Sequence, residues 1–109
     1  MGEQDRALIE EFKRRLPTDI VTHIRHMIMY GSRARGDSGQ DSDLDLVALV
    51  DENSPILEQR LDEIAYKLMW DHDFKPIISL KVFTEERFRS AASKGYSYYR
   101  AIEREGITV

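Results

Sequence analysis

Residues 30–46 read YGSRARGDSGQDSDLDL and join two apolar segments. The first segment, IRHMIMY at residues 24–30, stops at Gly31, and the second, DLDLVALV, occupies residues 43–50. Short apolar runs bounded by glycine, serine and aspartate are typical of strands in a buried sheet. The sequence therefore predicts two strands connected by a turn over residues 31–42, with a short helix after Ser32.

One helix is predicted before these strands and one after them. Apolar residues recur at helical spacing over residues 3–16, and Pro17 ends that segment. Ser54 is a favourable N-cap and Pro55 suits the first helical position, so a helix is predicted from there to about Asp71. The face of this helix that we expect to be buried carries Ile56 or Leu57, Leu61, Ile64, Ala65 and Leu68.

The last part of the chain adds a strand and two helices. Pro76 precedes a third apolar run at residues 77–83, and Thr84 is a favourable N-cap for the helix that follows. A final helix is predicted over residues 97–105, ended by Gly106 and followed by a short extended tail. This order predicts a single α/β (α+β) domain over residues 1–109, with a small mixed β-sheet and helices packed on it.

The composition excludes several classes of protein. The 109 residues contain no cysteine, which rules out disulfides, thiolate zinc sites and cysteine nucleophiles. The formal net charge of −4 argues against a protein that coats nucleic acid, so we expect no direct nucleic-acid binding. No apolar run approaches the roughly 20 residues that cross a bilayer, and the charged N-terminus lacks the apolar core of a signal peptide. We expect no membrane association and a cytoplasmic location.

Asp43 and Asp45 are the first candidates for chemistry. Residues i and i+2 of a strand point to the same face, so the two carboxylates project together while Leu44 and Leu46 project to the other face. Adjacent carboxylates repel one another, and a divalent cation that binds both removes the repulsion. Mg²⁺ commonly combines one or two protein carboxylates with substrate phosphates. The pair is therefore predicted to bind Mg²⁺.

The Gly31–Ser32 turn is the candidate anion site. Gly31 lets the backbone approach a ligand closely, and a helix starting after Ser32 directs free N–H groups and a hydroxyl at a phosphate. Arg33 and Arg35 add guanidinium groups that can bind phosphate. A Gly-Ser turn alone, or an Asp-x-Asp pair alone, is usually without function. The Gly-Ser turn and the Asp-x-Asp pair, separated here by residues 33–42, together predict a site for a nucleotide with Mg²⁺.

This combination resembles the signature of the DNA polymerase β-like nucleotidyltransferase superfamily. It is closest to the minimal nucleotidyltransferase (MNT) group, a branch similar to the kanamycin nucleotidyltransferase domain. The resemblance covers nearly the whole chain, because YRAIEREG at residues 99–106 also looks like the last helix of the family. It implies a polymerase β-like fold in which Mg²⁺ and ATP bind at the positions that match Gly31, Ser32, Asp43 and Asp45.

The resemblance also implies a reaction and a partner. An acceptor hydroxyl attacks the activated phosphate and pyrophosphate leaves, with Ser32, Asp43 and Asp45 as the catalytic positions. MNT proteins are often encoded beside a HEPN-domain RNase toxin; some act as antitoxins that add AMP to a toxin tyrosine, and others neutralise by binding. We expect an antitoxin of this kind that adenylylates a HEPN toxin, and a catalytically weak or inactive binding antitoxin is the alternative. The short chain favours an acceptor site completed by the partner or by a second copy.

The third predicted strand departs from the family pattern. Active members usually carry a third carboxylate on a later strand, whereas IISLKVF at residues 77–83 contains no acid. Ser79 and Lys81 share the polar face, and Lys81 is the residue that we expect in place of the third aspartate. Three explanations remain open: Lys81 binds a phosphate, Asp73 or Asp41 completes the site, or catalysis has been lost.

Two other groups of residues are weaker candidates for a functional site. His23 and His26 are three residues apart and have no third ligand in the sequence, which disfavours a zinc site. Tyr96, Tyr98 and Tyr99 could stack on nucleic-acid bases. We favour an amphipathic C-terminal helix that packs on the core or on a partner.

Overall fold

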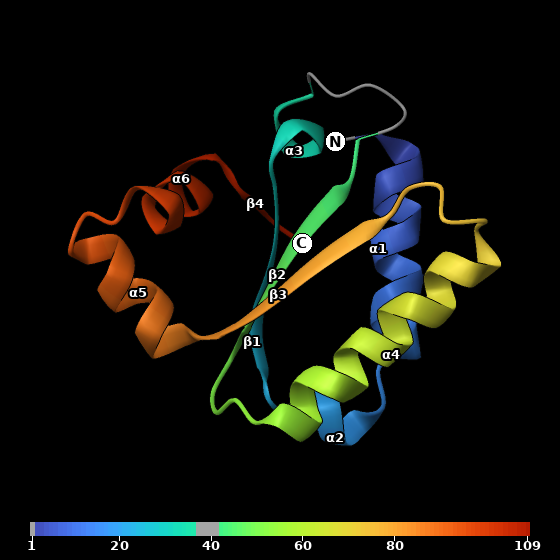
Figure 1. The fold of residues 1–109 in the computed structure, drawn as a ribbon, viewed down its shortest axis with the longest axis horizontal. Helices are drawn as coiled ribbons and strands as arrows, with labels where there is room; N and C mark the ends of the chain where they lie inside the picture. The colour runs from blue at the N-terminus through green and yellow to red at the C-terminus, as the bar shows by residue number, and fades with distance from the viewer. Residues whose placement is uncertain (1, 37–41) are drawn as a thin grey trace.

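The computed structural model describes residues 2–36 and 42–109, which form a four-stranded sheet with helices on both faces (Figure 1). The strand order is β3-β2-β1-β4, with bounds of Ile78–Thr84, Leu44–Val50, Ile24–Tyr30 and Ile107–Thr108 respectively. β1 is antiparallel to both β2 and β4, whereas β2 and β3 are parallel. The predicted mixed sheet is confirmed, and the expected extended tail is the short strand β4.

Helices cover the two faces of the sheet unequally. α1 (Glu3–Arg15) and α4 (Pro55–Asp71) pack on one face, while α5 (Glu85–Ser93) and α6 (Ser97–Glu105) lie over one end of the other face (Figure 1). The N-caps predicted at Ser54 and Thr84 are both present, with each side-chain oxygen accepting a backbone N–H three residues on. Two helices of a single turn, α2 (Thr18–Val21) and α3 (Ser32–Arg35), complete the described chain, and α2 lies just after Pro17, where the sequence predicted only the end of the first helix.

The central strand β2 explains the apolar run at residues 44–50. Leu44, Leu46 and Ala48 pack against α1 and α4, whereas Val47 and Leu49 pack against α5 and α6. A strand buried on both faces needs apolar residues at successive positions, because each face takes every second side chain. In α4 the structure buries Leu57 and leaves Ile56 exposed, which decides between the two residues that periodicity could not separate.

Among the described residues, α5 and α6 cover only part of their face of the sheet. Phe88 and Ile102 cover the sheet near Val47 and Leu49, toward the end of β2. The residue two positions before Val47 on that face is Asp45, at the start of β2. The sheet therefore presents polar side chains where β2 begins and apolar ones where it ends.

Within residues 2–36 and 42–109, no helix is both long and apolar enough to span a membrane.

Candidate functional site

Three neighbouring strands place one row of residues across the open end of the sheet. Asp45 of β2 pairs in register with Tyr30 of β1 on one side and with Ser79 of β3 on the other. Side chains directly opposite in a sheet point to the same face, so all three border one surface. Asp43 precedes β2 by one residue and is exposed, whereas Asp45 is half-buried. The two aspartates thus border the same surface, Asp43 at its solvent-exposed side and Asp45 at its more buried side.

Gly31 lies directly against the carboxylate of Asp45. Its backbone has φ 79° and ψ −161°, a conformation that is essentially restricted to glycine. A Cβ built on Gly31 would lie 2.5 Å from Oδ2 of Asp45, closer than any side-chain carbon can stay. The structure therefore brings the glycine-serine turn and the Asp-x-Asp strand together through this contact.

The short helix α3 fixes the course of the chain after this contact. The N–H of Arg35 donates to the carbonyl of Gly31, and the N–H of Gly36 donates to that of Ser32 at 2.9 Å. Gly36 ends the turn in the left-handed conformation, with φ 80° and ψ 11°. Ser32 is half-buried at the start of this turn, next to the residue that touches Asp45.

The two aspartates carry negative charge that the protein only partly offsets. Burial raises the pKa of the Asp45 carboxyl, the charge of Asp43 raises it further, and the charge of Lys81 lowers it. A buried carboxylate beside a like charge gains from a bound cation, because the cation offsets both causes of the raised pKa. Two hard carboxylate oxygens also suit Mg²⁺, which takes its remaining ligands from water and phosphate. In the part of the chain that the structure describes, no three His, Asp or Glu residues gather as a metal site.

Arg33 makes its contacts with protein atoms on both sides of the site. Its Nη1 donates to Oδ1 of Asp5 at 2.7 Å, and its Nε donates to the carbonyl oxygen of Ser42 at 2.9 Å. The side chains of Arg33 and Asp5 are only 11% and 9% exposed. Arg33 follows Ser32 in the chain, and Ser42 precedes Asp43, so one guanidinium links the turn to the aspartate pair. A phosphate-binding role for Arg33 stays a prediction.

Arg35 and Lys81 are the other two cations predicted for the site. Arg35 is exposed and faces Glu105 of α6, with 3.8 Å between Nη1 and Oε2. Lys81 is paired in register with Val47, two residues along the strands from the Ser79–Asp45 pair. Ser79, rather than Lys81, therefore occupies the position beside Asp45. The charge of Lys81 still reaches the site, since it lowers the pKa of Asp45.

No acid on β3 takes the place of a third carboxylate. Asp73 lies in the turn between α4 and β3 with φ 56°, and Asp41 falls outside the described residues. Asp5 is an acid that the sequence pattern did not single out, although it shares the buried face of α1 with Leu8 and Ile9. The sequence did contain a signal for Asp5: it is a charged residue at the helical spacing of the buried apolar positions of α1.

Aromatic residues close the site on the α6 side. The hydroxyl groups of Tyr30 and Tyr98 are hydrogen-bonded at 3.0 Å, and burial followed by this hydrogen bond raises the pKa of Tyr30. Tyr99 packs against Phe83 and Phe88, so the tyrosines of α6 contact the sheet as the amphipathic pattern predicted.

The two histidines do not form a zinc pair. Nδ1 of His23 lies 2.8 Å from Asp51, and Nε2 of His26 lies 3.2 Å from Glu85. Each histidine is therefore matched with a different surface carboxylate.

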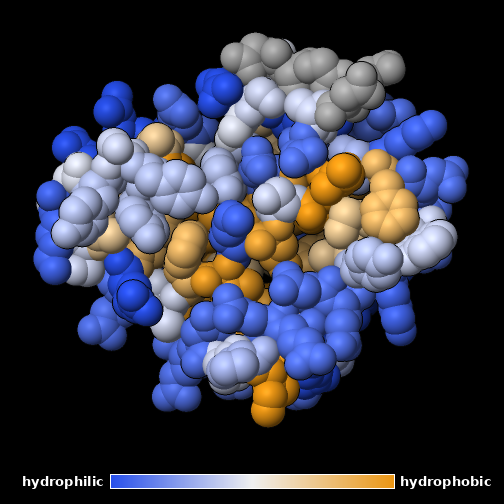
Figure 2. All heavy atoms as spheres, viewed as in Figure 1, coloured by the Kyte–Doolittle hydropathy of each residue, from blue (hydrophilic) through white to orange (hydrophobic). Residues whose placement is uncertain are grey.

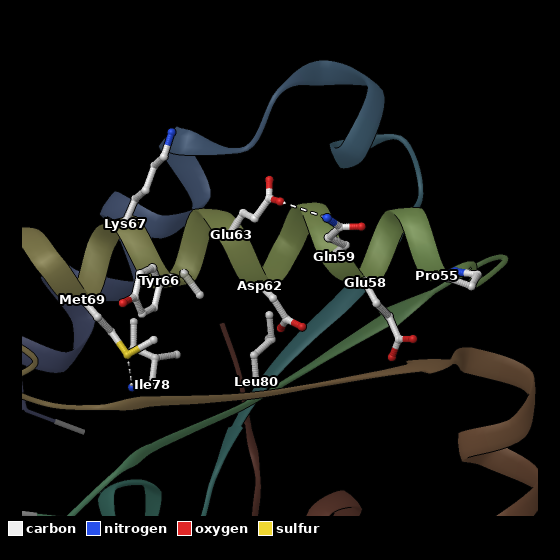
Figure 3. Close-up of a pocket in the computed structure, with 11 residues that line it drawn as sticks. Pro55, Glu58, Gln59, Asp62, Glu63, Tyr66, Lys67, Met69, Ile78 and Leu80 are labelled. Carbon is white, nitrogen blue, oxygen red and sulfur yellow. Dashed lines mark hydrogen bonds between the residues drawn. The ribbon is translucent and has the colours of Figure 1, made fainter.

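A groove of about 720 Å³ lies between α4 and β3 (Figure 3). Ile78 and Leu80 form its β3 side, and these residues alternate with Ser79, which faces Asp45. The groove is therefore on the opposite face of β3 from the aspartate pair.

Comparison with known proteins adds two findings. Residues 5–104 match the family described as the nucleotidyltransferase domain, a range that contains Gly31, Ser32 and both aspartates. A protein of Methanocaldococcus jannaschii, provisionally named as a protein adenylyltransferase, is 38% identical over 77 residues. That similarity covers 68% of this chain and 78% of the relative.

Proposed function

The chain belongs to the nucleotidyltransferase domain family and is a nucleotidyltransferase enzyme, and we propose that it transfers AMP from ATP to a protein hydroxyl with the help of Mg²⁺. The contact between Gly31 and Asp45 is the observation that carries this proposal. It joins the turn that would bind phosphate to the carboxylates that would bind the metal ion.

Asp43 and Asp45 are the proposed metal ligands. When bound there, Mg²⁺ would offset the charge on the phosphate oxygens of ATP and on the leaving pyrophosphate. The Ser32 hydroxyl and the backbone at Gly31 would hold a phosphate, since they lie next to the carboxylate of Asp45. The exposed cations Arg35 and Lys81 remain candidates for phosphate contact, because both are on the side of the sheet that carries the aspartates.

Transfer requires one bond to form and one to break. The acceptor oxygen bonds to the α-phosphorus as the bond between that phosphorus and the pyrophosphate oxygen breaks. We assign the hydroxyl proton to a carboxylate of the aspartate pair, which acts as the general base. Arg33 acts as a positioning residue, because its hydrogen bonds to Asp5 and Ser42 set the distance between Ser32 and Asp43.

A protein acceptor is supported by the name of the relative from M. jannaschii. We propose an antitoxin role in which the acceptor is a HEPN-domain toxin. A second candidate is an antitoxin that neutralises its toxin by binding alone. It is favoured by Ser79, which stands beside Asp45 at a position where a third carboxylate would complete the metal site.

Label transfer from α-labelled ATP distinguishes the two candidates. The protein, with any co-purifying partner and Mg²⁺, is compared with the Asp43→Asn/Asp45→Asn variant and with Asp73→Asn. Label on a protein band with the native chain and with Asp73→Asn, but not with the double variant, supports transfer at the proposed site. Loss of label in Asp73→Asn would assign the third carboxylate to that residue. A tight partner without any label transfer would support the binding antitoxin.

A further inference from the structure

The outer edge of β3 is open to another strand. β3 is the terminal strand of the sheet and pairs only with β2 among the described residues. The N–H of Leu44 donates to the carbonyl of Ile77 at 2.8 Å, so the backbone of residue 77 faces β2. Because backbone polar groups alternate along a strand, those of Ile78 and Leu80 face outward. Such an edge is a template for pairing with an added strand.

One outward N–H of this edge has a weak acceptor. The N–H of Ile78 lies 3.2 Å from Sδ of Met69, and the dashed line in Figure 3 marks this contact. A thioether sulfur accepts hydrogen bonds poorly compared with a carbonyl oxygen. The methionine side chain is also unbranched and flexible, so its sulfur can move aside. A carbonyl from an added strand would therefore be a better partner for this N–H.

The groove beside this edge is apolar at its base and acidic along α4. Ala65, Met69, Ile78 and Leu80 provide the apolar surface. Figure 3 shows the side chains of Glu58 and Asp62 pointing from α4 toward β3, whereas Lys67 points away. Neither Glu58 nor Asp62 has an ion-pair partner within residues 2–36 and 42–109. Burial and then the charge of Glu58 raise the pKa of Asp62, and the charge of Lys81 lowers it in part. These two acids would both gain from a cation in the groove.

Apolar surface continues from the groove toward the end of α4. Tyr66 and Trp70 are 52% and 61% exposed, and Ile77 at the start of the edge is 51% exposed. The rings of Tyr66, Trp70 and Phe74 pack edge to face with one another. Figure 2 shows apolar surface running across the middle of this face, with hydrophilic residues above and below it. An exposed apolar strip bordered by charges is typical of an interaction surface.

We propose that an extended segment of the acceptor protein, apolar on one side and carrying Lys or Arg, adds to the outer edge of β3. Its backbone pairs with Ile78 and Leu80, and its basic side chains lie at Glu58 and Asp62. This inference rests on the proposed transfer to a protein. Neighbouring strands are about 4.8 Å apart, so the segment lies about two strand spacings from β2. Residues of the segment that alternate away from the groove face the side of the sheet that carries Asp45.

Binding of designed peptides tests this inference without nucleotide. The probes are a ten-residue peptide whose groove-facing alternate residues are valine and lysine and whose other residues are serine, its counterpart with glutamate in place of lysine, and the lysine peptide with alternate backbone nitrogens methylated. Trp70 is the single tryptophan of the chain, so its fluorescence reports occupancy of the groove end. Amide hydrogen exchange at Ile78 and Leu80 reports strand pairing. We expect the unmodified lysine peptide to shift the fluorescence and to protect both amides, and the other two peptides to do neither.

Variants separate the backbone contact from the side chains. Glu58→Gln/Asp62→Asn should weaken binding of the lysine peptide about tenfold while the fold is retained. Leu80→Pro removes an N–H that faces away from β2, and Leu80→Ala keeps that N–H while shortening the side chain. Binding lost in the proline variant and kept in the alanine variant supports strand addition.

Two results would overturn the inference. One is the absence of amide protection at Ile78 and Leu80 with millimolar lysine peptide. The other is protection of these amides without peptide, together with a dimer in sedimentation, since a second copy would then occupy the edge. Neither the amide exchange nor the sedimentation measurement depends on label transfer. A protein that binds the peptide but transfers no label would refute the proposed function and leave the docking site standing.

Discussion

Replacing Gly31 by alanine tests the contact on which the site is built. The added methyl group would meet Oδ2 of Asp45 at 2.5 Å, and the residue would keep a φ of 79° with ψ −161°. Backbone strain of this kind costs about 1–3 kcal/mol, and forcing a side chain from its preferred rotamer costs about 0.5–1.5 kcal/mol. We therefore expect Gly31→Ala to lower the free energy of unfolding by about 2–4 kcal/mol. In a domain of this size the Tm falls by at least about 8 °C.

Two other glycines provide matched controls. Gly36 also has a positive φ, 80°, but a Cβ there would meet nothing within 4 Å. Gly36→Ala should therefore cost only about 1 kcal/mol, the price of the left-handed conformation. Gly106 has an ordinary φ of −73°, yet its Cβ would clash with Ile28 and with the carbonyl of Ile102. Gly106→Ala destabilises the fold without touching Asp45.

Urea unfolding and Mg²⁺-dependent label transfer are then measured on all three variants. Alanine reduces the entropy of the unfolded chain equally in each case, so that contribution cancels in the comparison. We expect Gly31→Ala to lose label transfer under conditions where it is folded, because Asp45 must turn away from Ser32. Gly106→Ala should keep transfer at a comparable loss of stability. Equal stability of Gly31→Ala and Gly36→Ala would refute the close contact between Gly31 and Asp45.

Three further predictions concern Asp5, Asp45 and Ser54. Asp5→Asn removes the carboxylate that pairs with the buried guanidinium of Arg33 and should lower the free energy of unfolding by about 3 kcal/mol in urea titrations. An effect as small as that of a surface pair would refute the linking role. The folded pKa of Asp45 is raised, so its contribution to stability is present below the ordinary aspartate pKa and is lost as the pH rises through the folded value. Asp45→Asn should therefore raise the Tm of the metal-free protein at pH 7 but not at pH 3, and Mg²⁺ should stabilise only the native chain; a lower Tm at pH 7 would contradict this. Ser54→Ala removes the N-cap of α4 and should cost about 1 kcal/mol, measured by thermal unfolding, with label transfer unchanged.

The sequence by itself predicted the longer helices, the three longer strands and the position of the turn. Helical spacing at residues 3–16, the Ser54–Pro55 start and the apolar run of β2 depend on residues close together in the chain, so the pattern is visible without a structure. The predicted strand 43–50 and helix 55–71 agree with β2 and α4 to within one residue. Local sequence also singled out Gly31 and the aspartate pair, because a glycine-serine turn after one strand and an Asp-x-Asp start of the next occur together.

Only the tertiary structure decided which residues meet across the sheet. Strand register depends on the packing of whole faces, and it places Ser79 rather than Lys81 beside Asp45. Asp5, one of the partners of Arg33, is 28 positions away in the sequence, so no local pattern could pair the two. The open edge of β3 likewise follows from the strand order, which places this strand at the end of the sheet. Periodicity describes a segment and its neighbours along the chain, whereas register, ion pairs and edges are set by contacts between segments that the chain brings together only when it folds.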